Sequence, residues 1–213
     1  VNVQGTINAV EAARKAKPRH VIFLSTILAA YEKTTSYGKS KLTGEGIIKR
    51  SGVPYTILRL SIAYKEGDDK TIGKLISLVR KLPIVPVVAG ANEKLQPVYS
   101  KDVAKAIAEA AMKKPSNKTY CLAGPVISFG ELMKAIASAI GAKRIFLPVP
   151  KPAMKAAVAI YSLLTLHKSF TNEQLDFILA GKAFSYEDAA KDLSFHPTSF
   201  SEGVRKAISH EKD

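Results

Sequence analysis

The chain has 213 residues, of which 46% are hydrophobic and 23% charged, and both values are ordinary for a globular protein. A single cysteine, Cys121, excludes an internal disulfide, and the lack of a run of about 18 apolar residues predicts no transmembrane helix. The net charge of +14 could attract nucleic acid or an anionic membrane. However, the lysines are spread along the chain without a basic block or interleaved aromatic residues, so we expect a lysine-rich solvated surface.

The first part of the chain is predicted to alternate helix and strand. The chain enters directly into a helix, after which the apolar, β-branched and aromatic run at 20–26 predicts a buried strand. Residues 36–50 predict a helix with Ser36 as its N-cap, and residues 55–60 predict the next strand. Strand, helix and strand in this order form a βαβ unit, whose two strands should be parallel.

The following elements keep the α/β character up to a proline-rich stretch at 147–152. They are a helix at 69–81, strands at 82–88, 118–122 and 144–149, and helices that begin near Ser100 and Ser128. Pro86 cannot donate a ladder hydrogen bond, so its strand should lie at an edge or be irregular. Glu131 lies at capping-box distance from Ser128. The chain is then expected to be helical to its end, with an apolar helix at 154–166 that packs in a core or lines a pocket.

Tyr37, Lys41 and Ser25 are the candidate catalytic residues. Tyr37 and Lys41 are four residues apart in a predicted helix, so they should share one helix face. A nearby ammonium favours the ionised form of a phenol, which can then exchange a proton near neutral pH. Ser25, at the end of the preceding strand, could hold a substrate oxygen in line. These groups suit hydride transfer to or from a carbonyl, although the tyrosine–lysine pair alone also fits a surface helix with a solvated lysine.

Five motifs stand out, at 2–6, 23–26, 36–41, 55–59 and 96–104. In their order and spacing they resemble the second half of an extended or atypical short-chain dehydrogenase/reductase of the NAD-dependent epimerase/dehydratase type. The resemblance implies an α/β fold: a partial Rossmann-type parallel sheet with a small, mainly helical substrate lobe. It places the C-terminal half of the Rossmann-like domain, with some inserted substrate-lobe elements, at 1–115. Residues 116–213 would then form mainly the substrate lobe and the C-terminal helices.

The resemblance also implies a Ser25–Tyr37–Lys41 triad and NAD or NADP as cofactor, with Lys41 also holding the nicotinamide ribose. The expected cofactor-binding residues are Asn2, Thr26, Tyr37, Lys41, Leu60, Ser61, Ile62 and Ala63. No G-x-G-x-x-G or G-x-x-G-x-x-G run occurs, and the chain starts at Val1. We therefore expect that the family's N-terminal glycine-rich half is missing and that the chain alone binds the cofactor weakly. No metal is expected, because the four histidines share no ligand spacing.

Three functions remain open at this point. The first is an NAD(P)-dependent oxidoreductase or epimerase that acts on a small carbonyl or hydroxyl substrate. The second is a non-catalytic cofactor-holding or assembly subunit, because residues 96–99 resemble the group that includes an accessory subunit of respiratory complex I. Leu60, Lys65 and Leu95 also depart from the pattern of sugar epimerases. The third is a basic phosphate- or nucleic-acid-binding protein, although no nucleic-acid motif is found.

The predicted strand at the start of the βαβ unit has consequences for partners. Its neighbour in the family's sheet would be absent, which leaves an apolar edge from Val21 to Leu24 open to pairing. We expect a homo-oligomer or a partner strand to cover this edge. A cytoplasmic location is expected, because the N-terminus has no signal-peptide pattern.

Overall fold

The computed structural model describes residues 1–32, 34–68, 70–88, 94–156 and 182–209, and these form two units. The first unit is built from Val1–Ala63, Ser100–Ala123 and Phe184–Pro197. The second unit is built from Tyr64–Tyr99, Gly124–Ala183 and Thr198–Asp213. Each unit therefore draws on separate stretches of the chain, and the predicted domain division after residue 115 stays a prediction.

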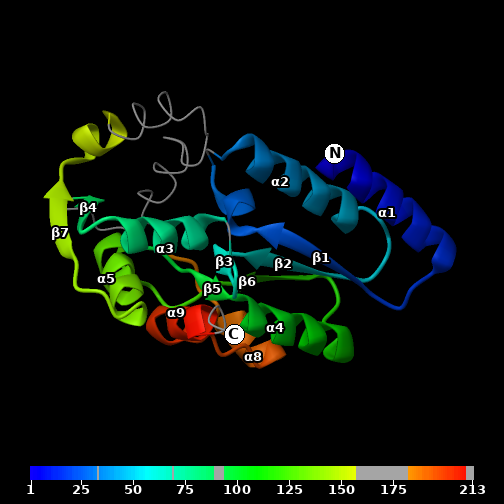
Figure 1. Cartoon of the computed structure of the whole chain (residues 1–213). Coiled ribbons are helices and arrows are strands. Elements are labelled where there is room, and N and C mark those ends of the chain that lie inside the picture. Colours follow the sequence, from blue (N-terminus) through cyan, green and yellow to red (C-terminus); the bar gives the residue numbers. More distant parts are fainter. Residues whose placement is uncertain (33, 69, 89–93, 157–181, 210–213) are drawn as a thin grey trace. The chain divides into compact units, whose positions relative to one another are not determined.

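Three parallel strands form the sheet of the first unit (Figure 1). They are β1 (Val21–Thr26), β2 (Tyr55–Leu60) and β6 (Lys118–Leu122), in the spatial order β1-β2-β6. The helix α2 (Ser36–Lys49) connects β1 to β2, so the predicted parallel βαβ unit is confirmed. Within the described chain β1 pairs only with β2, which leaves the other side of β1 as the edge of this sheet.

Helices cover both faces of this sheet (Figure 1). On one side lie α1 (Asn2–Ala16) and α2, and on the other side lie α4 (Ser100–Lys113) and α8 (Glu187–Leu193). Val10 of α1, Ile48 of α2 and Ile57 of β2 form a buried cluster on the first face. On the second face the Tyr120 hydroxyl donates a 2.7 Å hydrogen bond to Asp192 of α8. Because successive side chains of a strand point to opposite faces of the sheet, each of them packs against only one of the two helical layers. The mixed α/β class is thus confirmed.

The N-cap of α2 is Thr35 and not Ser36, so the sequence-based prediction was wrong by one residue. The Thr35 backbone is extended, and its hydroxyl accepts a 3.0 Å hydrogen bond from the Gly38 amide. An N-cap residue needs this non-helical backbone so that its side chain can reach the third amide of the helix. Ser36 already has helical geometry and cannot play that part.

The described part of the second unit contains two small sheets and several helices, and residues 151–156 are helical as well. The pairs are β4 (Ile84–Val88) with β7 (Ile145–Val149), and β3 (Ala63–Tyr64) with β5 (Val98–Tyr99), and the helices are α3 (Thr71–Lys81), α5 (Phe129–Ala139) and α9 (Phe200–Ser209). Among the described strands β4 pairs only with β7, which confirms the expected edge position of Pro86. The capping box of Ser128 and Glu131 at the start of α5 is also confirmed.

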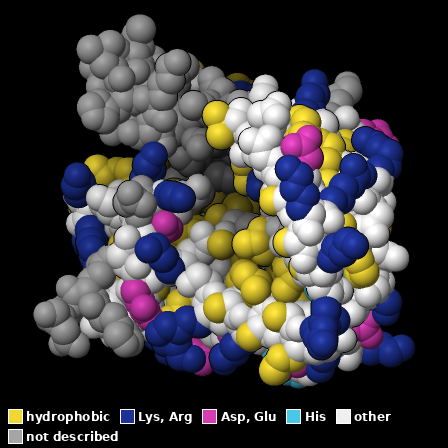
Figure 2. Space-filling model, turned by 90° about the vertical axis from the view of Figure 1, so that its right-hand side faces the viewer, with side chains coloured by type: hydrophobic (Ala, Val, Ile, Leu, Met, Phe, Trp, Pro, Cys, Tyr) yellow, Lys and Arg dark blue, Asp and Glu magenta, His cyan; other side chains and the backbone are white. Residues whose placement is uncertain are grey.

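Of the predicted apolar helix at 154–166, residues 157–166 lie outside the described part of the chain. No helix among the described residues is both long enough and apolar enough to cross a membrane. On the face shown in Figure 2, lysine and arginine side chains are spread over the surface, with fewer acidic side chains among them.

Candidate active site

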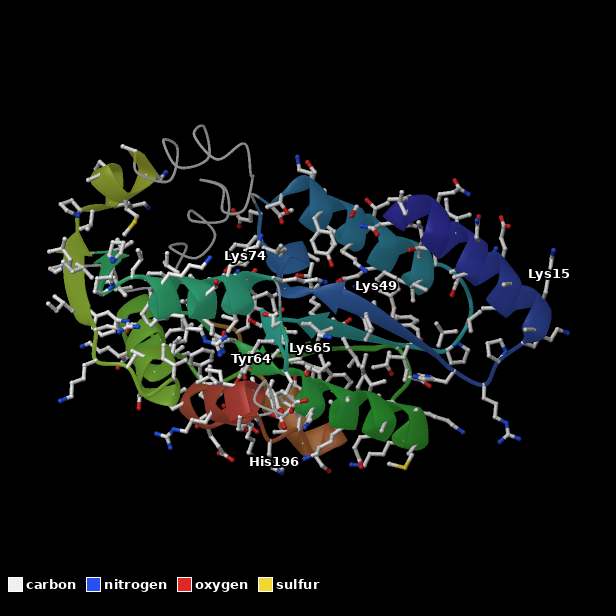
Figure 3. The ribbon with its side chains drawn as sticks, in the orientation of Figure 1. Lys15, Lys49, Tyr64, Lys65, Lys74 and His196 are labelled. Carbon is white, nitrogen blue, oxygen red and sulfur yellow. The ribbon has the colours of Figure 1, made fainter. Side chains whose placement is uncertain are left out.

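Tyr37, Lys41 and Glu45 form a column on the face of α2 that contacts β1. They are spaced four residues apart, which brings their side chains to one helix face. The Lys41 Nζ lies 5.9 Å from the centroid of the Tyr37 ring and 5.3 Å from that of Phe23. Tyr37 is 50% exposed, so its ring can be reached from solvent. In Figure 3, Lys49 marks the end of α2 that lies farthest from Tyr37.

Lys41 also contacts the end of the sheet. Its Nζ donates a 3.0 Å hydrogen bond to the carbonyl oxygen of Leu24 in β1. The Val21 amide donates a hydrogen bond to the carbonyl of Pro54, just before β2, so the backbone groups of Val21 point toward β2. Backbone groups along a strand point to alternate sides, so the amide and carbonyl of Leu24, three residues later, point to the open side of β1. The Lys41 ammonium therefore lies at the carboxyl end of the open strand edge.

Ser25 belongs to a second group of side chains, which is buried. Its hydroxyl donates a 2.7 Å hydrogen bond to Oε1 of Glu45, and the two residues are 4% and 1% exposed. Arg59 clamps the same carboxylate with two bonds, Nε to Oε1 at 2.8 Å and Nη2 to Oε2 at 2.7 Å. Ser25 and Arg59 are direct neighbours in the β1–β2 register, so this network ties α2 to both strands.

The network fixes the charge state of its carboxylate. Burial by itself would raise the pKa of Glu45, but the hydrogen bonds from Arg59 and Ser25 and the Arg59 charge outweigh burial and lower it. The hydrogen bond to Glu45 raises the pKa of Arg59, and this effect exceeds the opposing effect of burial. Both groups are therefore held in their charged forms, as a bidentate ion pair with good geometry.

Thr26, the last residue of β1, projects to the opposite face of the strand from Ser25. Its Oγ1 accepts a 3.3 Å hydrogen bond from the Leu28 amide and so caps the short 3₁₀ helix η1 (Ile27–Ala30). Within the described chain its hydroxyl proton has no acceptor. A Cβ at Gly38 would collide with the Thr34 side chain and approach the Leu28 Cβ to 3.1 Å. Glycine there lets the segment after Thr26 pack against the first turn of α2.

Besides Tyr37 and Lys41 on α2, the candidate cofactor residues occupy two places. Thr26 and Leu60 are register partners at the carboxyl ends of β1 and β2, where open α/β sheets bind their ligands. Ser61 follows, and its amide donates a 3.1 Å hydrogen bond to the Leu122 carbonyl, while Ile62 is half-buried and Ala63 exposed. Asn2 lies elsewhere, on α1.

The Asn2 side chain donates a 3.0 Å hydrogen bond to the Ser40 hydroxyl, which links the start of α1 to α2.

Among the described residues no group of three or more His, Cys, Asp or Glu side chains could hold a metal ion.

The buried Glu45 is the residue of this region that sequence reasoning missed. Its local signal was present, because it follows Lys41 by four residues and therefore extends the Tyr37–Lys41 column. An arginine at position 59 in an otherwise apolar strand was a second signal, because a buried arginine needs an anionic partner.

Comparison with known protein families matches residues 29–196 to the RmlD substrate binding domain. The chain belongs to this family. The match covers most of the chain and confirms the resemblance to extended short-chain dehydrogenase/reductases. No curated protein matches the sequence.

Several solved structures of this fold resemble the chain. UDP-glucose 4-epimerase of Thermotoga maritima, solved with UDP-glucose, gives a TM-score of 0.71 at 19% identity, over 99% of this chain and 69% of that one. UDP-glucuronic acid 4-epimerase of Bacillus cereus, with UDP-glucuronic acid and NAD, gives 0.72 at 18% identity, over 99% and 67%. dTDP-glucose 4,6-dehydratase of Bacillus anthracis, with NAD, gives 0.73 at 16% identity, over 100% and 68%.

At such identities the likeness shows the fold, and it confirms the expected Rossmann-type architecture. The comparisons give no support to the two alternative functions, an assembly subunit or a nucleic-acid-binding protein.

Proposed function

We propose that the chain forms part of an NAD(P)-dependent oxidoreductase or epimerase that acts on a carbonyl or hydroxyl group of a nucleotide-sugar substrate. The observation that carries the proposal is the Lys41 ammonium, which lies near the Tyr37 ring and bonds the Leu24 carbonyl at the carboxyl end of β1. Family membership supports the reaction class, and the structural neighbours solved with nucleotide sugars or NAD support the classes of substrate and cofactor.

The residues around Lys41 fit a nicotinamide cofactor. A lysine ammonium has three donors, and one of them is used on Leu24, which leaves two for the hydroxyl groups of a ribose. Leu60 and the three residues after it, at the carboxyl end of β2, would line the path of the nicotinamide. The bound cofactor would supply the hydride acceptor or donor. NAD and NADP are both compatible with these residues.

Tyr37 is the proposed acid–base group. Its ring is half exposed on the first turn of α2, where its hydroxyl can exchange a proton with a substrate oxygen. Lys41, one turn further along, places its ammonium 5.9 Å from the centre of the Tyr37 ring, where its charge can stabilise negative charge that develops on the reacting oxygens in the transition state. Tyr37 would therefore transfer the proton, and Lys41 would provide electrostatic support.

We assign the hydroxyl that holds the substrate oxygen to Thr26, although the sequence suggested Ser25. Ser25 has one hydroxyl proton, and this proton is directed at Glu45. The Thr26 proton has no acceptor within the described chain, and Thr26 borders the η1 segment that packs against Gly38, next to Tyr37. A catalytic role of Ser25 stays a prediction, and a direct comparison of the two hydroxyls can decide it.

The protein expressed from its natural gene provides the test of function. We expect turnover of at least one of UDP-glucose, UDP-glucuronic acid and dTDP-glucose, followed by NMR of the sugar, with a bound or added nicotinamide cofactor required. Lack of any sugar turnover across NAD and NADP would contradict the proposed reaction class for these substrates.

We also propose that a second strand, from another copy or from further polypeptide, covers the open edge of β1. Ile22 and Leu24 would then donate their amides to it, whereas the Phe23 amide points toward β2. Hydrogen exchange resolved by residue tests this arrangement. Slow exchange at Ile22 and Leu24 supports a covering strand, and fast exchange at both beside a protected Phe23 contradicts it.

A further inference from the structure

A cavity of about 620 Å³ lies in the second unit, at the ends of α3, α5 and α9. Its lining includes arginines from three separate parts of the chain, Arg80, Arg144 and Arg205, together with the apolar side chains of Ile140 and Ile208. Small-molecule sites typically measure about 300–1,000 Å³, so this cavity has room for a ligand. Its described lining contains no residue of the α2 column.

Arg144 is held in place before any ligand arrives. Its Nε donates to the Val79 carbonyl at 2.8 Å, Nη2 donates to the Arg80 carbonyl at 3.1 Å, and Nη1 donates to the Lys143 carbonyl at 3.2 Å. A guanidinium has five N–H donors, so two remain. Because the side chain is already ordered, binding an anion there costs little additional conformational entropy.

Arg205 supplies a second charge from the exposed face of α9. Its side chain makes no hydrogen bond or ion pair within the described part of the chain. The nearby acid on the same helix, Glu202, is engaged with Lys206 at 2.7 Å. Arg80 also lines the cavity and is already engaged. Among the described residues the lining contains no carboxylate, and its guanidinium groups bring positive charge that attracts anions.

We propose that this cavity binds a small organic phosphate. The planar fork of a guanidinium matches two oxygens of a phosphate group, and Arg144 and Arg205 would both contact it. Ile140 and Ile208 offer apolar surface to the body of the ligand. A phosphate attached to an apolar group therefore fits the cavity better than a phosphate ion or an uncharged ring alone. This proposal does not depend on the proposed reaction.

Phenyl phosphate is a suitable probe, because it joins a phosphate to an apolar ring and is not a nucleotide. In an NMR titration of the 213-residue chain we expect saturable shifts of the amides at 138–142 and at Ile208. Inorganic phosphate should bind the same place more weakly, and phenol should cause no shift there. Shifts that lie elsewhere, or equal binding of phosphate and phenyl phosphate, would overturn the proposal.

A pair of charge-matched variants tests the role of the arginines. Arg205→Gln should weaken binding of phenyl phosphate by about tenfold, because a charge-assisted bidentate contact is lost. Arg19→Gln removes the same charge from an exposed position in the first unit, and it should change affinity by less than about twofold. Equal affinities of Arg205→Gln and the unaltered chain would refute the site, as would an equal loss in both variants. Circular dichroism checks that both variants are folded.

Discussion

The Ser25 hydroxyl donates a 2.7 Å hydrogen bond to Oε1 of Glu45, and this bond separates two groups of side chains that the sequence places together. Ser25 joins the buried ion pair of Glu45 and Arg59, which fastens α2 to β1 and β2. Tyr37 and Lys41 occupy the same helix face closer to its N-terminus, where solvent and ligands can reach them. The first group is thus expected to support stability and the second to support chemistry.

The ion pair should be important for stability. Glu45→Gln leaves the Arg59 charge without its partner in a site where Arg59 is 19% and Glu45 1% exposed, so we expect a loss of about 3 kcal/mol in the free energy of unfolding. Urea unfolding measures this loss. Glu202→Gln is the control, because its exposed pair with Lys206 should contribute only about 0.3–0.5 kcal/mol. Similar losses in both variants would show that the buried pair has no special role.

The stability contributed by Glu45 should depend on pH. The folded state lowers the pKa of this carboxyl, so its contribution is fully present above the ordinary glutamate pKa of about 4.3. This contribution is lost as the pH falls through the lowered pKa, because protonation of Glu45 then breaks its ion pair with Arg59. The difference in unfolding free energy between the unaltered chain and Glu45→Gln should therefore shrink on acidification. A difference that stays constant or grows below this pH would contradict the direction of the pKa shift.

The two hydroxyls at the end of β1 should have different roles. Thr26→Val keeps the shape of the side chain and removes the hydroxyl, so kcat should fall by about tenfold or more if Thr26 holds the substrate oxygen. Ser25→Ala should mainly lower stability, by about 1.5–3 kcal/mol, because it removes a buried hydrogen bond to a charged group. Steady-state kinetics and urea unfolding of both variants measure these effects. The opposite pattern would return the catalytic role to Ser25.

Lys41 should matter for cofactor binding. Lys41→Gln removes the ammonium that lies beside Tyr37 and Leu24, so the apparent affinity for NAD or NADP should fall by about tenfold and kcat should fall with it. Lys39→Gln is the matched control, because Lys39 is an exposed lysine on the same helix. Cofactor titration and steady-state kinetics of the two variants provide the comparison. Equal effects would indicate a general charge effect in place of a specific contact.

Much of the sheet follows from local sequence patterns. The apolar β-branched runs around Ile22 and Ile57, separated by a helix, are enough to predict two parallel strands. The N-cap of α2 was misplaced because Thr35 and Ser36 both carry the required hydroxyl, and only the backbone angles distinguish them. Element boundaries therefore depend on backbone geometry that residue type alone does not give.

The candidate site divides in the same way. The proximity of Tyr37 and Lys41 is a property of one helix and could be predicted from their spacing. The sequence contains signals for a buried Glu45 and for its pairing with Arg59. The contact between Ser25 and Glu45 could not be predicted, because it depends on the β1–β2 register that sets Ser25 beside Arg59 and on the packing of α2 over both strands. Contacts of that kind connect residues far apart in the chain, and hydrophobic periodicity carries no information about them.

The central claim is that the Tyr37 hydroxyl transfers the proton during the reaction. The most direct measurement compares kcat of Tyr37→Phe and of Tyr55→Phe in the protein expressed from its natural gene, with the sugar substrate it turns over. Tyr37→Phe should lower kcat by about 10²–10⁴-fold without loss of stability, because the hydroxyl lies on a half-exposed side chain. Tyr55→Phe removes a hydroxyl at the start of β2 and should leave kcat nearly unchanged. Full activity of Tyr37→Phe would contradict the account.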